Sequence, residues 1–500
     1  MKHLGADERA FFSLISQAVI ANPFSEERAR LDLEISGLFP GVSYEERLNR
    51  TIAEVVRRTD RFEAGGQADI RLYSGEDRRL VEHAFLFDAF HRFLQPFDAF
   101  ISKQISAGDT SLKVPFAGET LSLLHRRGFS PDRACRFFAL FFQLRRAFFF
   151  IDHSLVGRSE SMKQLRRKLW NNVFTHDIDI YDRYLWNRME DFSTLLLGET
   201  GTGKGTAAAA IGRSGYIPFD EKKGCFAESF CRSFVELNLS EFSESLIESE
   251  LFGHKKGAFT GAIENYRGVF DRCSPYGAIL LDEIGEVTRP VQIKLLRVLQ
   301  ERRFCPVGSH EMRRFPGRVI AATNRSMTEL REGGILRDDF FYRLCSDVIT
   351  VPPLRTRIRE DPAELDELLA LTVARMLGDP SPEVAERVKK EIERHPGRTY
   401  PWPGNVRELE QCVRQILLNR AWTPRTAAGQ PEPVADLMEG FEEGRLNART
   451  LMSGYCKMLY DRLGTFEAVA RRTQIDRRTV KKYIGMRDEK ERLVNRVRKQ

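Results

Sequence analysis

The sequence predicts an α/β protein whose parallel sheet lies between helical regions. Between about Leu155 and Val351, short apolar runs, Phe234–Leu237 among them, alternate with stretches of helical pattern, which is typical of strands joined by crossover helices. A glycine-rich turn follows one of these runs, and two adjacent carboxylates follow another. Residues 1–150 and 360–420 instead show apolar residues at helical spacing. The sheet region is therefore where we expect the chemistry.

Composition excludes several classes of protein. The chain has 500 residues, 42% hydrophobic and 30% charged, which fits roughly three globular domains. It has no uncharged apolar run of about 18 residues, so we expect no transmembrane helix, and the first residues lack the apolar core of a secretory signal. The eight cysteines form no CxxC pair, which argues against a zinc site or a disulfide framework. We expect a cytoplasmic protein.

The charge of the chain is unevenly distributed. The formal net charge is +7, yet residues 445–500 hold 16 Lys and Arg against 6 Asp and Glu. This local excess of ten positive charges leaves a near-neutral body. Such a tail indicates a polyanionic partner, although the charge alone is equally compatible with a solvated basic surface.

The N-terminal region, residues 1–150, is predicted to be mainly helical. Residues 81–150 contain 15 of the 36 phenylalanines. Phe87, Phe90 and Leu94 recur at helical spacing before Pro96 interrupts them. Such a stripe is typical of packing core, and the region shows no metal-ligand cluster, so its sequence indicates no chemistry.

The strongest motif is a nucleotide-binding turn. A predicted strand, Ser193–Leu197, leads into a glycine-rich turn and then into an alanine-rich helix. This is the order that a P-loop needs, because its backbone N–H groups and the helix N-terminus face the phosphates. Lys204 is expected to reach the β- and γ-phosphates, and Thr206 is one candidate for the magnesium hydroxyl, since Gly205 stands where the general pattern has Ser or Thr. The predicted ATP-binding residues of the turn are Gly198, Glu199, Thr200, Gly201, Thr202, Gly203, Lys204, Gly205 and Thr206.

Two further strands are predicted to end beside this turn. The run Ala278–Leu281 is followed by Asp282, which would orient Mg²⁺, and by Glu283, which would polarise the attacking water. The run Val319–Ala322 is followed by Asn324, which we expect near the γ-phosphate. All three strand ends belong to one sheet edge, where α/β proteins bind ligands.

One segment carries a specific resemblance. Residues Gly257, Ala258, Phe259, Thr260, Gly261 and Ala262 read GAFTGA, and the chain resembles the sigma-54-dependent transcriptional activators, or bacterial enhancer-binding proteins. The resemblance covers about Leu155 to Val413 and the C-terminal unit. It implies an AAA+ ATPase that forms a ring, usually a hexamer, with ATP between subunits. It also implies that the Gly257–Ala262 loop, chiefly Phe259 and Thr260, contacts sigma-54.

Other positions match the same family one by one. The resemblance implies that Asn238 is a switch partner of Glu283, that Arg337 and Arg343 are arginine fingers toward a neighbouring subunit's ATP, and that Arg407 reads the γ-phosphate from the lid. It also places Val156–Ser159 near the adenine. The chain departs from the family at Gly205, where the family generally has Glu. Two spacers, Arg166–Asp191 and Arg213–Arg232, are longer than usual and are expected either to alter the ring interface or to mark a branch of the family.

Residues 465–484 resemble the Fis-type helix-turn-helix of the same family. Two short helices, Thr465–Arg472 and Arg477–Ile484, are predicted, with Asp476 capping the second. That helix is expected to enter the major groove of double-stranded DNA. Its predicted DNA-binding residues are Arg477, Arg478, Thr479, Lys481 and Lys482.

The predicted organisation is therefore an AAA+ P-loop ATPase, made of a parallel sheet plus a helical lid and flanked by other helical domains. The predicted parts are a helical N-terminal regulatory domain (1–150), the α/β core (151–352), the lid (353–420), a linker (421–440) and the helix-turn-helix domain (441–500).

The hypothesis from the sequence is an activator that uses ATP and Mg²⁺ to open promoters held by sigma-54 RNA polymerase holoenzyme. It would bind upstream DNA and form a homo-oligomeric ring, with no membrane partner. One alternative is a DNA-binding regulator that uses ATP only to oligomerise. Another is an AAA+ DNA remodeller, which would need DNA-tracking loops.

Overall fold

The computed structural model describes residues 1–394, 397, 400–420, 422 and 447–484. The chain divides into two compact units, Met1–Arg420 and Ala421–Gln500, which are treated separately. Apart from Trp422, the predicted linker at 421–440 lies outside the described residues.

The N-terminal region is helical, as predicted. Two of its helices begin at serines whose side chains accept a backbone N–H, Ser25 from Arg28 and Ser43 from Glu46. The elements are α1 (Ala6–Ile20), α2 (Glu26–Ser36), α3 (Tyr44–Ala64), η1 (Ile70–Leu72), α4 (Gly75–Arg92), α5 (Leu94–Ala107), α6 (Ala117–Arg126) and α7 (Pro131–Ser154). Of the predicted stripe, Phe87 is buried, as are Phe97, Phe138 and Phe142 elsewhere in the region, whereas Phe90 and Leu94 are half-buried.

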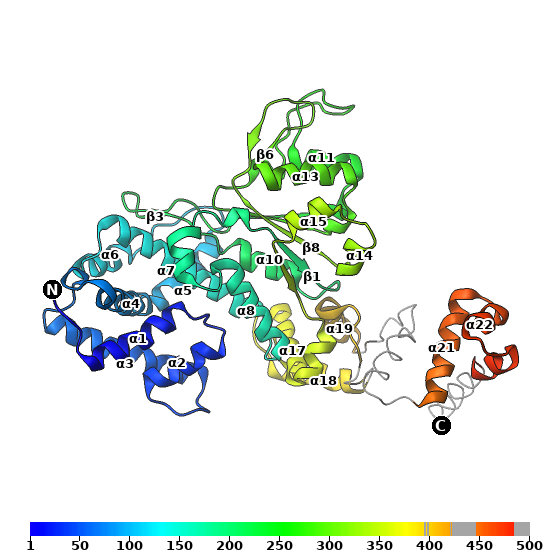
Figure 1. The fold of residues 1–500 in the computed structure, drawn as a ribbon, viewed down its shortest axis with the longest axis horizontal. Coiled ribbons are helices and arrows are strands. Elements are labelled where there is room, and N and C mark those ends of the chain that lie inside the picture. The colour runs from blue at the N-terminus through cyan, green and yellow to red at the C-terminus, as the bar shows by residue number, and fades with distance from the viewer. Residues whose placement is uncertain (395–396, 398–399, 421, 423–446, 485–500) are drawn as a thin grey trace. The chain divides into compact units, whose positions relative to one another are not determined.

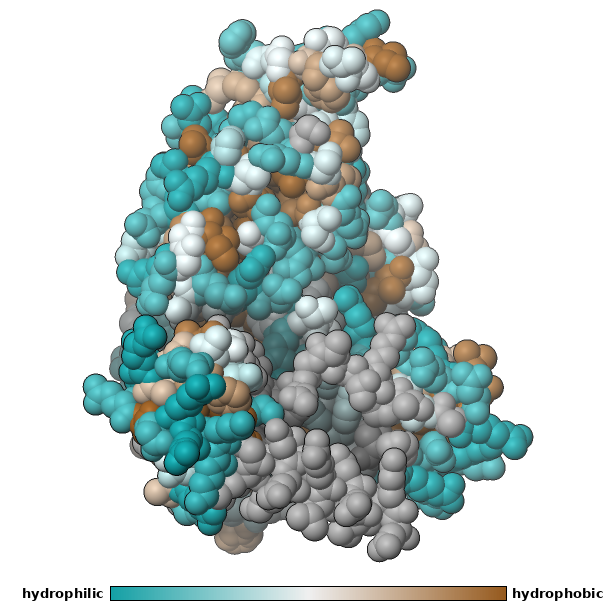
Figure 2. Space-filling view, turned by 90° about the vertical axis from the view of Figure 1, so that its right-hand side faces the viewer, coloured by the Kyte–Doolittle hydropathy of each residue, from teal (hydrophilic) through white to brown (hydrophobic). Residues whose placement is uncertain are grey.

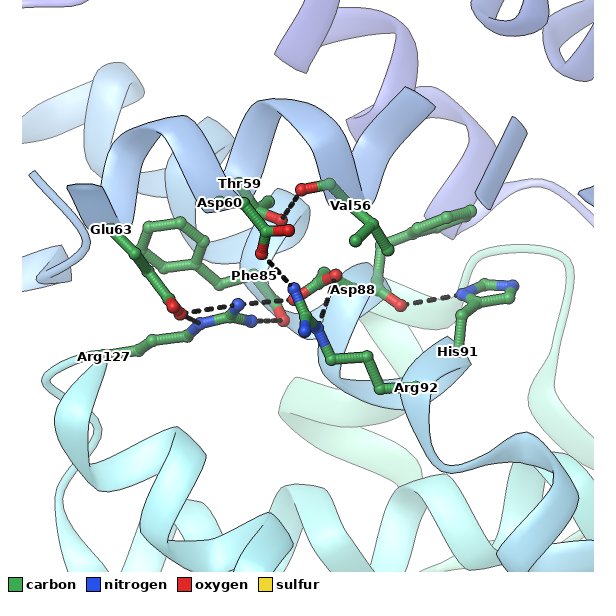
Figure 3. A network of polar contacts seen from close by, with 10 residues as sticks. Val56, Thr59, Asp60, Glu63, Phe85, Asp88, His91, Arg92 and Arg127 are labelled. Atoms are coloured by element: carbon green, nitrogen blue, oxygen red, sulfur yellow. Dashed lines mark hydrogen bonds and ion pairs between the residues drawn. The ribbon is translucent and has the colours of Figure 1, made fainter. Parts of the chain in front are cut away.

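A charged network fixes how α3, α4 and the end of α6 pack together (Figure 3). The fully buried Arg127 donates to Asp88 and Glu63 and to the carbonyl oxygen of Phe85, 3.0 Å away. Arg92 donates to Asp88 at 2.8 Å and to Asp60 at 2.5 Å. Each buried charge therefore has a partner of opposite sign, as burial in an apolar surrounding requires.

The centre of the first unit is a five-stranded parallel sheet. Its strands are β1 (Thr194–Leu197), β4 (Phe234–Asn238), β5 (Ala278–Asp282), β8 (Arg318–Thr323) and β9 (Asp347–Thr350), in the order β4-β5-β8-β1-β9. The sequence predicted the first four of these strands within a residue or so. It did not predict β9, which is a short edge strand exposed at both of its ends.

Alternate strand residues face two different cores. Leu195, Ile279 and Val319 point toward one face, which is covered by α11 (Glu244–Phe252), α12 (Val269–Arg272), α13 (Arg289–Glu301) and α15 (Asp338–Leu344). Leu196, Leu280 and Ile320 belong to a second core that continues through α10 (Lys204–Gly212) and α8 (Glu160–Phe174) into the N-terminal helices (Figure 1). The sheet and the N-terminal region therefore share one hydrophobic core.

The remaining helices of the first unit follow the strands β8 and β9 in the chain. The short α14 (Met327–Arg331) follows β8 and starts with a capping box formed by Ser326 and Glu329. A helical lid follows β9 and consists of α16 (Leu354–Glu360), α17 (Ala363–Leu377), α18 (Pro382–Arg394) and α19 (Asn405–Asn419). The lid prediction for residues 353–420 thus matches helical structure.

The two long spacers noted in the sequence are the segments that dock the N-terminal region. The first contains the turns α9 (Ile178–Ile180), η2 (Tyr181–Leu185) and η3 (Met189–Asp191), and the buried Tyr181 hydroxyl donates to Gln143 of α7 at 3.0 Å. The second contains the hairpin β2 (Phe219–Asp220) and β3 (Cys225–Phe226). Phe226 of this hairpin stacks on Phe142 of α7, with ring centroids 4.0 Å apart.

The second unit is a small helical cluster. It contains α21 (Ala448–Leu463), α22 (Phe466–Thr473) and a helical stretch at 477–484. Val469, Val480 and Ile484 are buried against Cys456 and Leu459 of α21. Asp476 accepts the backbone N–H of Thr479 at 3.0 Å, which confirms the predicted cap.

Among the described residues, none of the helices combines the length and the apolar character needed to cross a membrane.

We predict that Phe226→Ala loosens the contact between the N-terminal helices and the sheet. The ring is 2% exposed, and removing a buried phenylalanine side chain costs about 3–5 kcal/mol. Thermal unfolding should begin at lower temperature, and amide hydrogen exchange in α7 should accelerate. Phe39→Ala is the matched control, since Phe39 is 84% exposed. Equal behaviour of the two variants would contradict the shared core.

Candidate functional site

The glycine-rich turn lies at the carboxyl end of β1, as predicted. Gly201 and Gly203 have φ angles of 81° and 100°, a left-handed region that favours glycine. The turn runs into α10, whose first residue is Lys204. A Cβ atom at Gly201 would lie 2.3 Å from the carbonyl oxygen of Gly404 in the lid, so close packing also requires glycine there.

Lys204 is buried and points back over the turn. Its ammonium donates to the carbonyl oxygens of Gly198 at 2.8 Å and Glu199 at 3.2 Å. Burial lowers the pKa of Lys204, while the nearby carboxylates of Glu283 and Asp282 act in the opposite direction. The lysine is thus held at the turn with two acids close by.

Those two acids end β5. Asp282 accepts the backbone N–H of Glu283 at 3.0 Å. Glu283 adopts φ 54° and ψ 48°, a left-handed conformation that is uncommon for a residue with a side chain and is concentrated at functional sites. This turn of the backbone follows the strand immediately and leaves both carboxylates beside the glycine-rich turn.

Asn324 joins the third strand end to the other two. Its backbone N–H lies 3.4 Å from a carboxylate oxygen of Glu283, and its side-chain amide lies 3.4 Å from the hydroxyl of Thr200. The structure therefore brings together the three strand ends that the sequence singled out. Asn324 lines a shallow depression with Glu199 and Thr200 that adjoins the main pocket.

Asn238 lies in the same pocket but is not bonded to Glu283. Its side-chain oxygen accepts the N–H of Ser240 at 3.1 Å, and its amide donates to Glu241 at 3.2 Å. It pairs in register with Asp282 on the neighbouring strand. The Asn238 side chain thus caps the turn after β4. The partner that the resemblance implies, Glu283, is the residue that follows Asp282.

The lid closes the other side of the pocket. Asn405 donates to the carbonyl oxygen of Thr200 at 3.1 Å, and the N–H of Val406 donates to Gly201 at 3.1 Å. Arg355 forms two hydrogen bonds to Glu199, at 2.7 and 2.5 Å, and lowers the pKa of that carboxyl group. The predicted Arg407 lines the pocket from α19.

These elements enclose a pocket of about 470 Å³. One end carries the polar groups described above, and the other is an apolar slot. The sequence predicted only one part of this slot, the segment Val156–Ser159. The slot is lined by Leu155, Val156, Met162, Leu165, Leu368 and Leu371. An apolar slot joined to a phosphate-binding turn suits a nucleotide, since the base is flat and apolar and the phosphates are charged.

A buried ion pair fixes the slot. Arg357 donates to Glu364 at 2.6 Å and to the carbonyl oxygen of Val156 at 2.6 Å. Glu364 also accepts the N–H of Ser159 at 2.7 Å. The lid is thereby attached to the segment that precedes α8.

The Gly257–Ala262 loop projects between α11 and α12, on the side of the domain away from the lid (Figure 1). The loop closes on itself through a bond from Gly257 N–H to Ala262 at 2.8 Å. Phe259 packs edge-on to His254, with centroids 4.9 Å apart, yet 39% of the residue is exposed. Thr260 is exposed at the tip.

Comparison with known proteins identifies this domain. Residues 178–350 match the family model described as the sigma-54 interaction domain. The chain therefore contains a sigma-54 interaction domain.

Curated relatives agree with this assignment. The Nif-specific regulatory protein of Azotobacter vinelandii is 41% identical over 230 residues, 46% of this chain and 40% of the relative. The DNA-binding transcriptional regulator NtrC of Azospirillum brasilense is 36% identical over 262 residues, 52% of this chain and 47% of the relative. Regulatory protein AtoC of Escherichia coli (strain K12) is 37% identical over 259 residues, which are 50% of this chain and 51% of the relative. The chain spans about half the length of these relatives.

Among solved structures, NtrX from Brucella abortus in complex with ATP aligns with a TM-score of 0.41 and 21% identity, over 74% of this chain and 79% of that chain.

A second loop of the sigma-54 interaction domain was missed by sequence reasoning. The hairpin β6 (Arg303–Phe304) and β7 (Arg313–Arg314) leads to a loop that packs on the Gly257–Ala262 loop. The N–H of Lys255 donates to Val307 at 3.0 Å, and a Cβ atom at Gly308 would touch Ala258 at 2.6 Å. Figure 2 shows apolar surface among polar residues at this end of the molecule. Two apolar residues near these loops, Ile263 and Met312, have exposures of 77% and 53%.

Arg337 and Arg343 do not line the nucleotide pocket of their own chain. Arg337 caps α15 and pairs with Asp339 at 2.8 Å, and Arg343 donates to the carbonyl oxygen of Leu299 at 3.1 Å. Within one chain, therefore, neither of these two arginines of the sigma-54 interaction domain lies at the nucleotide pocket.

Gly205 lies where the pocket meets β4. A Cβ atom there would stand 3.7 Å from a carboxylate oxygen of Glu236. The pKa of Glu236 is raised, first by burial and second by the negative charge of the nearby Asp282. The described residues contain no group of three or more His, Cys, Asp or Glu placed to hold a metal ion. Asp282 and Thr206 both line the pocket, and Mg²⁺ takes few protein oxygens because water and phosphates complete its shell.

The predicted DNA-binding residues of the second unit lie on the helical stretch at 477–484. Arg478, Lys481 and Lys482 are exposed, whereas Val480 and Ile484 on the opposite face are buried. Arg477 is exposed and pairs with Glu467 of α22 at 2.9 Å. Thr479 is engaged by the Asp476 cap. One face of this helix thus presents mainly positive charge.

We predict that Gly201→Ala weakens ATP binding by the sigma-54 interaction domain. The substitution combines a positive φ with a contact of 2.3 Å to the lid backbone, and such strain costs about 1–3 kcal/mol. ATP affinity measured by calorimetry should fall about tenfold. Gly118→Ala is the control, because a Cβ atom there meets nothing within 4 Å. Unchanged affinity in Gly201→Ala would contradict the observed contact between the lid and the turn.

Proposed function

We propose that the protein is a cytoplasmic, ATP-driven activator of sigma-54 RNA polymerase holoenzyme. The observation that carries the proposal is an exposed Phe259–Thr260 tip on the same domain as a complete P-loop pocket. An exposed aromatic in a loop flanked by glycines offers contact area to a partner protein. The family match at residues 178–350 and the similarity to curated transcriptional regulators support it.

ATP hydrolysis is the proposed chemical step. The apolar slot holds the base, and the glycine-rich turn with Lys204 holds the phosphates. Glu283 accepts a proton from a water that attacks the γ-phosphorus, while the bond from that phosphorus to the bridging oxygen breaks and ADP leaves. Asp282 and Thr206 would hold Mg²⁺, which offsets phosphate charge.

Neighbouring chains are proposed to complete the site. Arg337 and Arg343 lie away from their own pocket, so they serve a neighbour's ATP in a homo-oligomeric ring, taken to be a hexamer. Arg407 reads the γ-phosphate of its own chain. Hydrolysis is proposed to change the contact between Glu283 and Asn238, two side chains that already share the pocket, and so to move the loop around Phe259.

DNA binding is assigned to the second unit. The exposed basic face formed by Arg477, Arg478, Lys481 and Lys482 suits the phosphates and base edges of a major groove. Binding to double-stranded DNA upstream of a promoter would concentrate the ATPase near the polymerase.

We predict that Thr260→Ala retains ATPase activity and DNA binding but abolishes promoter opening. The experiment measures ATP-dependent open-complex formation at a sigma-54 promoter with holoenzyme and the full-length chain. The full chain is needed, because the N-terminal helices share a core with the sheet. Thr110→Ala, an exposed threonine of the N-terminal region, is the control.

The result also separates the alternatives. A regulator that uses ATP only to oligomerise, or an AAA+ DNA remodeller, has no need of this loop. Promoter opening by Thr260→Ala at the level of the unchanged protein would therefore refute the proposed activator mechanism.

We predict that Glu283→Gln binds ATP with near-normal affinity and hydrolyses it about 10²–10⁴-fold more slowly, since a positioned general base contributes that factor. Steady-state phosphate release and nucleotide binding are measured on the same preparation. Rapid turnover by this variant would show that another group accepts the proton.

A further inference from the structure

A second cavity, larger than the nucleotide pocket, lies between the N-terminal helices and the segments that dock them. Its volume is about 720 Å³, within the range of pockets that bind small organic molecules. We call it the interdomain cavity. Its walls come from α1 to α5 and α7 on one side, and from α8 and the Ile178–Tyr184 turns on the other.

The apolar part of the interdomain cavity's wall is rich in aromatic rings. Phe148 stacks on Phe24 with ring centroids 5.2 Å apart, and Phe90 contacts Phe141 at 5.6 Å. Aromatic rings offer a large apolar surface with few rotatable bonds, so they bind apolar bodies with little loss of entropy. The aromatic residues of the wall include Phe87, Phe90, Phe137, Phe141, Phe148 and Trp170.

The same walls carry an excess of positive charge. Seven arginines and four carboxylates line the cavity. Several of these arginines are ion-paired: Arg28 with Asp32, Arg133 with Glu82, Arg136 with Asp182, and Arg145 with Asp98, which lies outside the wall. With Asp98 included, seven arginines still face only five carboxylates. Around Asp179, three cationic or titratable side chains gather: Arg79 at 2.7 Å, Arg183 at 3.7 Å and His83 at 3.6 Å. Arg78 is exposed and has no ion-pair partner within the described part of the chain.

His91 adds a polar group to the apolar wall. Its Nδ1–H donates to the carbonyl oxygen of Phe87 at 2.7 Å, and burial lowers the pKa of His91 to about 3. The ring is therefore neutral near pH 7, and Nε2 is a hydrogen-bond acceptor. Figure 3 shows this nitrogen directed away from the Arg127 network, and none of the described residues donates to it.

We propose that the interdomain cavity binds a small organic anion with an aromatic or alkyl body. The phenylalanines and Trp170 take the body, the arginine excess near Arg78 and Asp179 attracts the anionic group, and His91 Nε2 accepts a bond from a donor on the ligand. An uncharged molecule of the same shape binds less tightly, because only the anion gains from the positive wall.

One helix connects this cavity to the ATPase site. Trp170 of α8 lines the interdomain cavity, while Met162 and Leu165 of the same helix line the nucleotide pocket. Asn172, two residues beyond Trp170, donates to Thr194 of β1 at 2.9 Å and to Asp347 of β9 at 2.6 Å. A ligand against Trp170 therefore shifts the energy of a helix that also touches the nucleotide and the strand before the P-loop.

The binding test uses two fluorescent probes with the full-length chain, without ATP or DNA. The first, 1-anilinonaphthalene-8-sulfonate, is an aromatic anion, and the second, N-phenyl-1-naphthylamine, has the same aromatic body and no charge. The sulfonate should bind with a stoichiometry near one per chain and several-fold more tightly than the amine. Equal or weaker binding of the sulfonate would overturn the anionic class of ligand.

Variants locate the probe. Leu144→Trp fills the cavity from α7 and should lower sulfonate affinity at least tenfold, whereas Leu418→Trp, at a residue that is 80% exposed, should leave it unchanged. Arg78→Gln should lower sulfonate affinity several-fold without changing the binding of the amine. Circular dichroism and ATPase activity check that each variant is folded. Full sulfonate affinity in a folded Leu144→Trp protein would overturn the site.

A separate measurement tests the connection through α8. Saturating sulfonate should change ATP affinity several-fold in the unchanged protein and not in Leu144→Trp, and ATP should change sulfonate affinity by the same factor. Intact sulfonate binding with unchanged ATP affinity would overturn the coupling. This part rests on the proposed function, whereas the binding test does not, so the two can fail separately.

Discussion

The shared aromatic core is the constraint on which the arrangement of the first unit depends. Phe142 of α7 lies between the N-terminal helices and the β2–β3 hairpin. Its ring stacks on that of Phe226 and packs near that of Phe230, with the centroids of the latter pair 6.1 Å apart. The fully buried Arg146, one turn further along α7, donates to the carbonyl oxygens of Arg213 and Gly215 at the end of α10. Because α10 begins at Lys204, the helix that starts at the glycine-rich turn is fixed at its other end by the N-terminal region.

This arrangement gives the two long spacers a physical role. Both were noted in the sequence as departures from the family, with the ring interface as one explanation. In the structure, the turns around Tyr181 and the hairpin around Phe226 bury their side chains against α7. These two segments belong to the sheet-containing domain and hold it against the N-terminal region. The two parts are therefore joined by more than the stretch of chain that links them.

The sequence predicted the parts whose signal is local. Four sheet strands, the P-loop, the acids after β5 and the cap at Asp476 were all found from short patterns, because strand alternation, glycine turns and capping depend on neighbouring residues. The edge strand β9 was missed, since only Ile349 of its four residues is buried. The interdomain cavity was missed because Phe87, Phe141 and Trp170 show only that they are apolar, and the space between them depends on how distant helices pack. The contact of Asn238 was also not predictable, because its amide has a local partner in Glu241 that competes with Glu283.

The shared core also limits how the N-terminal region can regulate the ATPase. Burying one large aromatic side chain contributes about 2 kcal/mol, so detaching α7 from the buried Phe226, Phe230 and Tyr181 would cost about 6 kcal/mol. Coupling between two ligand sites is typically about 1–3 kcal/mol, and a ligand shifts an equilibrium only by its difference in affinity for the two states. Release of the whole region is therefore outside the reach of such a ligand. A small displacement of α8, which touches both cavities, is within it, and this makes α8 the element through which a signal from the N-terminal region would reach the nucleotide.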